Sequence, residues 1–241
     1  VYKGAYPKIY AEDVSAQRLY SNYIRLYVER DVRQIKNIAD LNTFQRFMRL
    51  CAGRTGQILN LSSLGNDCGI NHSTAKAWIS LLEASYVVFL LHPFYKNFGK
   101  RIIKSPKLYF IDTGIACSLL NIRSAQELST HYLRGGLIES MIIADLLKQQ
   151  YNGDMRPHIY FWRDNIGNEI DCIIDESRWP VAVEVKAGQT IAPGFFKELI
   201  FWNNITKDSP APKYLVYGGT EDQSWPQAEV LSWRSAGNLI S

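Results

Sequence analysis

Residues 181–186 read VAVEVK. They belong to a nearly all-apolar stretch, Trp179 to Val185, which predicts a strand covered on both faces of a sheet. Because successive side chains of a strand point to opposite faces, Glu184 and Lys186 share one face. Burying a carboxylate and an ammonium side by side is costly unless they serve a purpose. This stretch therefore predicts a sheet and a functional site on it.

Acidic residues interrupt two further apolar segments. In EIDCII, residues 169–174, Glu169 and Asp171 share one face of a second predicted strand. Upstream, Glu139 interrupts the apolar side of an amphipathic helix predicted from Leu137 to Gln150. Taken singly, Glu139 also fits a solvated acid near a helix start, and Glu169 also fits a strand-end charge. We expect these acids to meet at one edge of the sheet.

The surrounding segments complete an α/β pattern. Further strands are predicted at His158 to Trp162 and at Tyr214 to Tyr217, and a helix from Phe195 to Asn203 precedes the last strand. The order helix, strand, strand, strand, helix, strand predicts an α/β domain over residues 124–241, in which residues 124–136 are a linker. Two large aromatic residues of these segments are expected in the core, Trp162 and Trp179.

This set of side chains suits hydrolysis of a phosphodiester. Carboxylates hold a hard divalent cation, Mg²⁺ or Mn²⁺, which offsets charge in the transition state and helps to deprotonate a bound water. A lysine near that water orients it and stabilises the developing charge. The predicted metal ligands are Asp171, Glu184 and Glu139, and the predicted catalytic residues are these three acids with Lys186. An ion pair at a strand end is the alternative interpretation.

The first half of the chain predicts a winged helix-turn-helix domain over residues 38–123. Asp40 and Asn60 are predicted N-caps of short helices, and a glycine-containing turn leads into the second helix of the motif. Strand-like residues from Tyr86 to Phe94 and from Lys107 to Ile111 predict a β-hairpin wing behind that helix. Such domains bind DNA or serve as protein-packing modules.

The candidate DNA contacts lie in two places. Residues on the early exposed face of the second helix are Ser73, Thr74 and Lys76. The predicted wing loop has no acidic residue between positions 96 and 107, and its cations are Lys96, Lys100, Arg101, Lys104 and Lys107. From this loop we expect Lys100, Arg101 and Lys104 to contact phosphates. A solvated basic loop is the alternative.

The acid and lysine positions resemble the PD-(D/E)XK nuclease superfamily, which includes restriction endonucleases and Holliday-junction resolvases. By position, Asp171 matches the motif's metal-binding aspartate, Glu184 and Lys186 match the (D/E)-x-K pair, and Glu139 matches the acid on the preceding helix. Ile170 stands where the motif has proline. The resemblance implies a restriction-endonuclease-like α/β domain with a central mixed sheet and a Mg²⁺-dependent nuclease activity, or a decayed nuclease fold used as a binding scaffold.

Nearly the whole chain is similar to the C-terminal region of a family of predicted prokaryotic AAA-type ATPases. The similarity rests on YIRLYVERDV at residues 23–32 and YFIDTG at residues 109–114, followed by the acid and lysine motifs. It implies that an ATPase domain of the same chain, and ATP with it, lies upstream, because residues 1–241 hold no Gly-x-x-x-x-Gly-Lys-Ser/Thr loop. The alternative function is a non-catalytic DNA- or protein-interaction module of such an ATPase.

Composition bounds these predictions. The 241 residues carry a formal net charge of +4, and 46% are hydrophobic, which excludes a disordered chain and permits a nucleic-acid partner, DNA above all. No apolar run predicts a membrane helix, and four scattered cysteines predict a reducing cytoplasm and no zinc site. We expect a piece of a longer protein, because the chain begins at Val1, and an oligomer is possible. Residues 1–37 are predicted to be a helical junction segment, with one long helix over residues 12–37.

Overall fold

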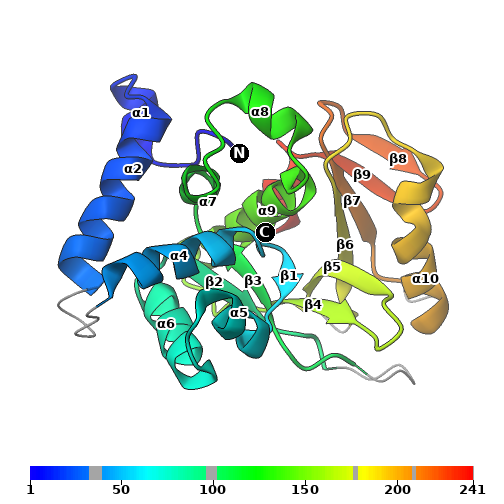
Figure 1. Cartoon of the computed structure of the whole chain (residues 1–241). Coiled ribbons are helices and arrows are strands. Elements are labelled where there is room, and N and C mark those ends of the chain that lie inside the picture. Colours follow the sequence, from blue (N-terminus) through cyan, green and yellow to red (C-terminus); the bar gives the residue numbers. More distant parts are fainter. Residues whose placement is uncertain (33–39, 96–101, 176–178, 208–209, 241) are drawn as a thin grey trace. The chain divides into compact units, whose positions relative to one another are not determined.

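The computed structural model of the chain describes residues 1–32, 40–95, 102–175, 179–207 and 210–240. They fall into two compact units (Figure 1). The first comprises Val1–Leu90 and Leu108–Met141, and the second comprises Leu91–Lys107 and Ile142–Ser241. The predicted fold class is confirmed: the N-terminal part is helical with a small sheet, and the C-terminal part is α/β with a mixed sheet.

The first unit is mainly helical. Its elements are α1 (Pro7–Ala11), α2 (Ala16–Leu26), the π-helix η1 (Tyr27–Val32), α4 (Leu41–Ala52), β1 (Gln57–Ile58), α5 (Leu61–Cys68), α6 (His72–Ala84), β2 (Val88–Leu91), β3 (Lys107–Phe110), α7 (Thr113–Leu119), α8 (Ala125–Thr130) and the start of α9 (Arg134–Asn152). Within the described residues, its strands form a three-stranded sheet of order β1-β3-β2. The predicted hairpin of β2 and β3 is confirmed, and β1 is an additional strand.

The predicted helix caps of the first unit are confirmed. The Asp40 carboxylate accepts a hydrogen bond from the Thr43 amide at 2.9 Å, and the Asn60 side chain accepts one from the Ser63 amide at 3.0 Å. Between α5 and α6, Gly69 has a φ of 74°, a conformation that L side chains rarely adopt. The helix-turn-helix geometry therefore follows from local chemistry.

The N-terminal helix differs from its prediction over residues 12–37. Asp13 has a φ of 49°, which interrupts the helical path, and a new helix, α2, begins after Ser15, whose hydroxyl accepts from the Arg18 amide at 3.5 Å. From Tyr27 the helix widens into the π-helix η1. Residues 33–37 lie outside the described residues.

The predicted linker at residues 124–136 is wrong, because helices occupy most of it. Ser124 caps α8 by accepting from the Glu127 amide at 3.1 Å, and α9 already begins at Arg134. The glycine pair that indicated a linker has a packing role instead. A Cβ on Gly136 would lie 2.9 Å from the Thr55 carbonyl oxygen, so this turn of α9 approaches the Thr55 backbone as only glycine allows.

The core of the first unit forms where α6 packs onto α4. The Trp78 ring meets the Phe44 and Phe47 rings edge-on, with centroids 5.1 and 5.2 Å apart. Because one face of α6 is buried in this way, the opposite face, with Ser73 and Lys76, is exposed. The four cysteines of the chain are free and buried.

The second unit is built on a mixed sheet. Its elements are the end of α9, β4 (Ile159–Arg163), β5 (Glu169–Ile174), β6 (Val181–Lys186), the 3₁₀ helix η2 (Pro193–Phe196), α10 (Lys197–Ile205), β7 (Lys213–Tyr217), β8 (Gln223–Trp225), β9 (Ala228–Ser232) and the 3₁₀ helix η3 (Ala236–Leu239). Within the described residues, the sheet has six strands in the order β4-β5-β6-β7-β9-β8. The pairs β6–β7 and β7–β9 are parallel, and the other pairs are antiparallel.

The predicted strands and helices of this unit are confirmed within a few residues. The strands β8 and β9 were not predicted. The three residues of β8 are all exposed, so this strand lacks an apolar pattern. Trp162 is fully buried against Trp202 of α10, with ring centroids 5.5 Å apart, as expected for a core residue. Trp179 was expected in the core as well, but it is 38% exposed.

The described ends of the predicted wing loop pair with β4. The Phe94 amide donates to the Phe161 carbonyl oxygen at 2.6 Å, and the Phe161 amide donates to the His92 carbonyl oxygen at 3.1 Å. Further on, the Ile103 amide donates to the Arg163 carbonyl oxygen at 3.0 Å. These ends are therefore bound to a strand of the second unit and are not the free arms of a wing.

Candidate functional site

Strands β5 and β6 carry the predicted site of the second unit. They pair antiparallel from Ile174–Val181 to Cys172–Val183, and the pairing stops there. Continuing this register by one residue places Asp171 opposite Glu184, on the same face of the sheet. At this point the Asp171 Oδ2 atom accepts a hydrogen bond from the Val185 amide at 2.9 Å. The Asp171 side chain thus replaces the backbone hydrogen bonds between β5 and β6 at this position, and Asp171 and Glu184 lie where the two strands separate.

The two acids are held in a largely water-free setting. Glu184 is 2% exposed and Asp171 is 8% exposed, and the valines on either side of Glu184 are buried. The Lys186 Nζ atom donates to the Glu184 Oε1 atom at 2.5 Å. The Glu184–Lys186 pair of the predicted motif is therefore a real contact on the sheet.

Glu169 lies two residues before Asp171 on β5 and adds a third acid to Asp171 and Glu184. One of its carboxylate oxygens lies within 4.8 Å of one of Asp171. The Arg163 Nη1 atom of the neighbouring strand β4 donates to the Glu169 Oε2 atom at 2.8 Å. Glu169 and Asp171 are members of an acidic cluster of the kind that can hold a metal ion.

Lys107 is the residue of the cluster that the sequence did not predict there. It was expected in the basic wing loop, but its side chain is buried, with 1% of the residue exposed. Its Nζ atom forms an ion pair with the Glu169 carboxylate and lies 3.8 Å from the Asp171 Oδ1 atom. The same ammonium lies 5.7 Å from the centroid of the Phe161 ring.

Glu139 lies on the part of α9 that belongs to the first unit. The Tyr109 hydroxyl of β3 donates to the Glu139 Oε1 atom at 2.6 Å. One residue further along α9, the Ser140 hydroxyl donates to the Phe110 carbonyl oxygen at 3.1 Å. These bonds fix the Glu139 carboxylate on β3. Its role as a metal ligand stays a prediction.

The predicted DNA contacts are placed only in part. Lys76 and Ser73 are exposed on α6, and Lys104 is exposed as well. The Asn71 Oδ1 atom, which caps α6, accepts from the Ser73 hydroxyl at 2.7 Å and from the Thr74 amide at 2.8 Å. Ser73 and Thr74 thus have a role in the helix start. Lys100 and Arg101 lie outside the described residues.

The donor set of the acidic cluster fits a hard divalent cation. Carboxylate oxygens are the ligands that Mg²⁺ and Mn²⁺ prefer. Glu169 and Asp171 offer such oxygens within 4.8 Å of one another on β5, and Glu184 carries a further carboxylate on the adjacent strand β6. The surrounding bases are equal in number to these acids: Lys107, Arg163 and Lys186. A cation that enters the cluster therefore meets carboxylates whose charge is already largely compensated.

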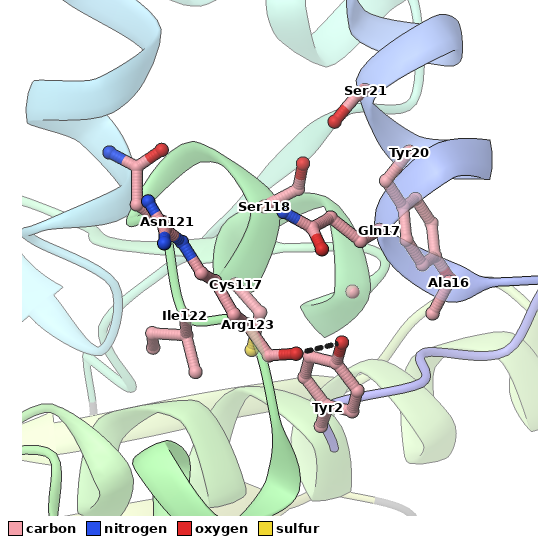
Figure 2. Close-up of a pocket in the computed structure, with 11 residues that line it drawn as sticks. Tyr2, Ala16, Gln17, Tyr20, Ser21, Cys117, Ser118, Asn121, Ile122 and Arg123 are labelled. Atoms are coloured by element: carbon pink, nitrogen blue, oxygen red, sulfur yellow. Dashed lines mark hydrogen bonds between the residues drawn. The ribbon is translucent and has the colours of Figure 1, made fainter.

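A small cavity in the first unit offers no comparable chemistry. It has a volume of about 50 Å³ and lies between α2 and α7, where Figure 2 shows the Tyr2 hydroxyl donating to the Arg123 carbonyl oxygen, a bond of 2.5 Å. This volume suits one or two water molecules. Burial raises the pKa of the Cys117 thiol in its wall to about 12, so that thiol stays protonated at neutral pH.

Sequence reasoning missed Lys107 and Arg163 as members of the cluster. A lysine opening the apolar stretch KLYF, residues 107–110, was a signal of a buried cation. The pattern could not indicate its partners, however, because they lie more than sixty positions further along the chain. Only the fold brings Lys107 beside β5.

Comparison with known proteins places both halves of the chain. The domain of unknown function DUF8612 matches residues 1–126, and the domain of unknown function DUF4143 matches residues 134–235. Domains of the second kind typically follow AAA-type ATPase domains. No solved structure matches the chain. Among the described residues, no helix has the length and apolar character needed to cross a membrane.

Two mycobacterial proteins are similar to the chain. They are the uncharacterised proteins Rv2008c of Mycobacterium tuberculosis and Mb2031c of Mycobacterium bovis, each 29% identical over 180 residues. The match covers 74% of this chain and 39% of each relative. The chain thus corresponds to about two fifths of the length of these relatives.

Proposed function

We propose, from the premise that the chain belongs to the DUF8612 family, that it is the C-terminal part of an AAA-type ATPase and acts on DNA as a metal-dependent phosphodiesterase. The second unit carries the proposed catalytic residues of β5 and β6, and the proposed DNA contacts lie on α6 of the first unit and at Lys104 of the second unit. The observation that supports the chemistry most is the placement of Asp171 and Glu184 where two paired strands separate, with Lys186 bonded to Glu184. ATP acts through a domain upstream of residues 1–241.

The division of labour within the site follows from these contacts. Asp171, Glu184 and Glu169 would hold Mg²⁺ or Mn²⁺, and Glu139 is the predicted further ligand. The bound cation supplies charge compensation to the phosphodiester and acidity to a water. Lys186 lies at the end of β6, partly exposed, where its ammonium can orient that water and contact the phosphate while bonded to Glu184.

Cleavage of DNA by the purified chain tests this proposal. We expect linear and single-stranded DNA to be cut in millimolar Mn²⁺ or Mg²⁺ and to stay intact with a chelator. Asp171→Asn keeps the shape of the side chain and removes its charge, so we expect cleavage to fall by roughly a hundredfold or more. Asp175→Asn is the matched control, because Asp175 is an exposed acid just beyond β5. Equal cleavage by Asp171→Asn and the wild type would contradict the proposed site.

DNA contacts are proposed at two separate places, on α6 of the first unit and in the segment before β3, which belongs to the second unit. The second helix of the helix-turn-helix buries Trp78 and exposes Lys76, which is the arrangement that places a recognition helix against a duplex. Lys104 adds an exposed cation in the second unit. Phosphate contacts of this kind give affinity that does not depend on base sequence.

A double substitution tests the proposed DNA contacts of Lys76 and Lys104. We expect Lys76→Ala with Lys104→Ala to weaken binding of duplex DNA and to reduce the slope of log affinity against log salt by about one to two, because each phosphate contact releases about one counterion. Fluorescence anisotropy between low and moderate salt measures both effects. Lys8→Ala is the control, because Lys8 is an exposed lysine of α1 that pairs with Glu12. An unchanged affinity and an unchanged salt slope in the double variant would contradict the proposed DNA contacts of Lys76 and Lys104.

A second candidate function is a non-catalytic interaction module of the same ATPase. The observation that favours it is the charge balance of the cluster, in which Lys107 and Arg163 already pair with the acids. Paired charges of this kind also occur as purely structural networks. Metal-free and metal-loaded chains that bind DNA equally, with no cleavage of any substrate, would favour this function.

A further inference from the structure

Lys107 is a buried cation at the centre of the acidic cluster. The residue is 1% exposed, and its ammonium contacts Glu169 and lies 3.8 Å from the Asp171 Oδ1 atom. The ammonium also lies 5.7 Å from the centroid of the Phe161 ring, which supplies a weak attraction. Burial of an ammonium is tolerated only where carboxylates offset its charge. The Glu169 and Asp171 carboxylates therefore stabilise the buried Lys107 ammonium, and the ammonium in turn offsets the negative charge of the two carboxylates.

The position of this ammonium is the position that a divalent cation needs. Glu169 and Asp171 offer carboxylate oxygens within 4.8 Å of each other, a spacing that a single ion can bridge. The Lys107 Nζ atom forms ion pairs with these same two carboxylates. An ammonium and a metal ion cannot both take the same oxygens at full strength, because two cations at such a distance repel strongly in a water-poor site.

We propose that Lys107 is a resident counter-ion of the acidic cluster, which holds the Glu169 and Asp171 carboxylates together and competes with a divalent cation for their oxygens. This inference rests on the proposed function, since it concerns the same carboxylates. It adds a regulation of that site: metal affinity is set by how firmly the ammonium is held. Arg163 donates to the other Glu169 oxygen and thereby orients that carboxylate. Among the described residues, the contacts of Arg163 do not include Asp171.

Metal binding to Lys107→Met tests this inference. Methionine keeps the length and apolar stem of the side chain and removes the charge, so the cluster keeps its carboxylates and loses its cation. We expect isothermal titration calorimetry to show Mn²⁺ bound about tenfold more tightly, or better, than by the wild type. We also expect the metal-free variant to unfold at a lower temperature and Mn²⁺ to raise its unfolding temperature more than that of the wild type.

Two companion variants make the result specific. Lys107→Arg keeps the positive charge, so we expect no tenfold gain in Mn²⁺ affinity. Adding Asp171→Asn to Lys107→Met should remove the gain, because it removes one of the two carboxylates. Lys107→Gln, which retains a polar side chain, replaces Lys107→Met if that variant does not fold. Mn²⁺ affinity that is unchanged or lower in the uncharged variant would overturn the inference.

The outcome separates this inference from the proposed function. Tighter Mn²⁺ binding by Lys107→Met without cleavage of DNA by any variant would support the counter-ion and contradict the phosphodiesterase. Metal-dependent cleavage by the wild type, with no gain in affinity for Lys107→Met, would do the opposite. The calorimetric signal needs no turnover, so the two conclusions do not depend on one another.

Discussion

Replacement of Lys186 by alanine is expected to lower metal-dependent cleavage of DNA by roughly a hundredfold or more while the chain still binds Mn²⁺. The reason is the position of this residue at the end of β6, where its Nζ atom lies 2.5 Å from the Glu184 Oε1 atom and part of the side chain reaches solvent. The carboxylates stay in place, but the ammonium that we propose to contact the phosphate and to orient the water is gone. Initial rates on a labelled duplex and Mn²⁺ titration of the same sample measure the two effects.

The matched control for this substitution is Lys213→Ala. Lys213 lies on the adjacent strand β7, beside Ala182 at the other end of β6, and its Nζ atom donates to the Asn203 Oδ1 atom at 2.9 Å. We expect this variant to cleave like the wild type. Cleavage by Lys186→Ala at the rate of the control would exclude Lys186 as a catalytic residue, whatever its effect on folding.

The largest expected loss of stability belongs to Trp162→Ala. Trp162 is fully buried on β4 and packs against two aromatic rings of α10, those of Trp202 at 5.5 Å and Phe201 at 6.0 Å between centroids. Its removal leaves a cavity between the sheet and α10, so we expect the free energy of unfolding to fall by about 3–5 kcal/mol. Urea unfolding followed by far-ultraviolet circular dichroism measures this loss without relying on tryptophan fluorescence.

Two comparisons support the interpretation of that loss. Trp162→Phe keeps most of the ring and removes the indole N–H, which is buried without a hydrogen-bond partner among the described residues, so it should cost far less than alanine. Trp233→Ala removes a tryptophan that is 40% exposed, and we expect a loss below about 1 kcal/mol. A loss for Trp162→Ala as small as that for Trp233→Ala would contradict the described packing.

Much of the fold could be predicted because its signals are local. Asp40, Asn60 and Gly69 determine where helices begin and end through bonds to atoms a few positions away. The alternation in VAVEVK and EIDCII likewise fixes which side chains share a face. The errors arose where a local pattern had another cause, as with Gly136, which indicated a linker but serves a close approach to the Thr55 backbone.

The acids of the candidate site and Lys186 were predictable, whereas Lys107 and Arg163 were not. Glu184 and Lys186 are two positions apart on one strand, and their contact follows from strand geometry alone. Lys107, the first residue of β3, is brought to Glu169 because the residues just before it pair with the end of β4. No periodic pattern in the sequence indicates this contact, because Lys107 and Glu169 do not lie on the same helix or strand.

The α/β class and the faces on which Asp171, Glu184 and Lys186 lie follow from the sequence, since each depends on neighbours within a few residues. Which cations pair with the acids of β5, in contrast, depends on the tertiary structure. A buried carboxylate responds to whichever cation the folded chain places within a few ångströms, and for Glu169 and Asp171 that cation is an ammonium from a distant strand. The competition between that ammonium and a metal ion is a property of the fold.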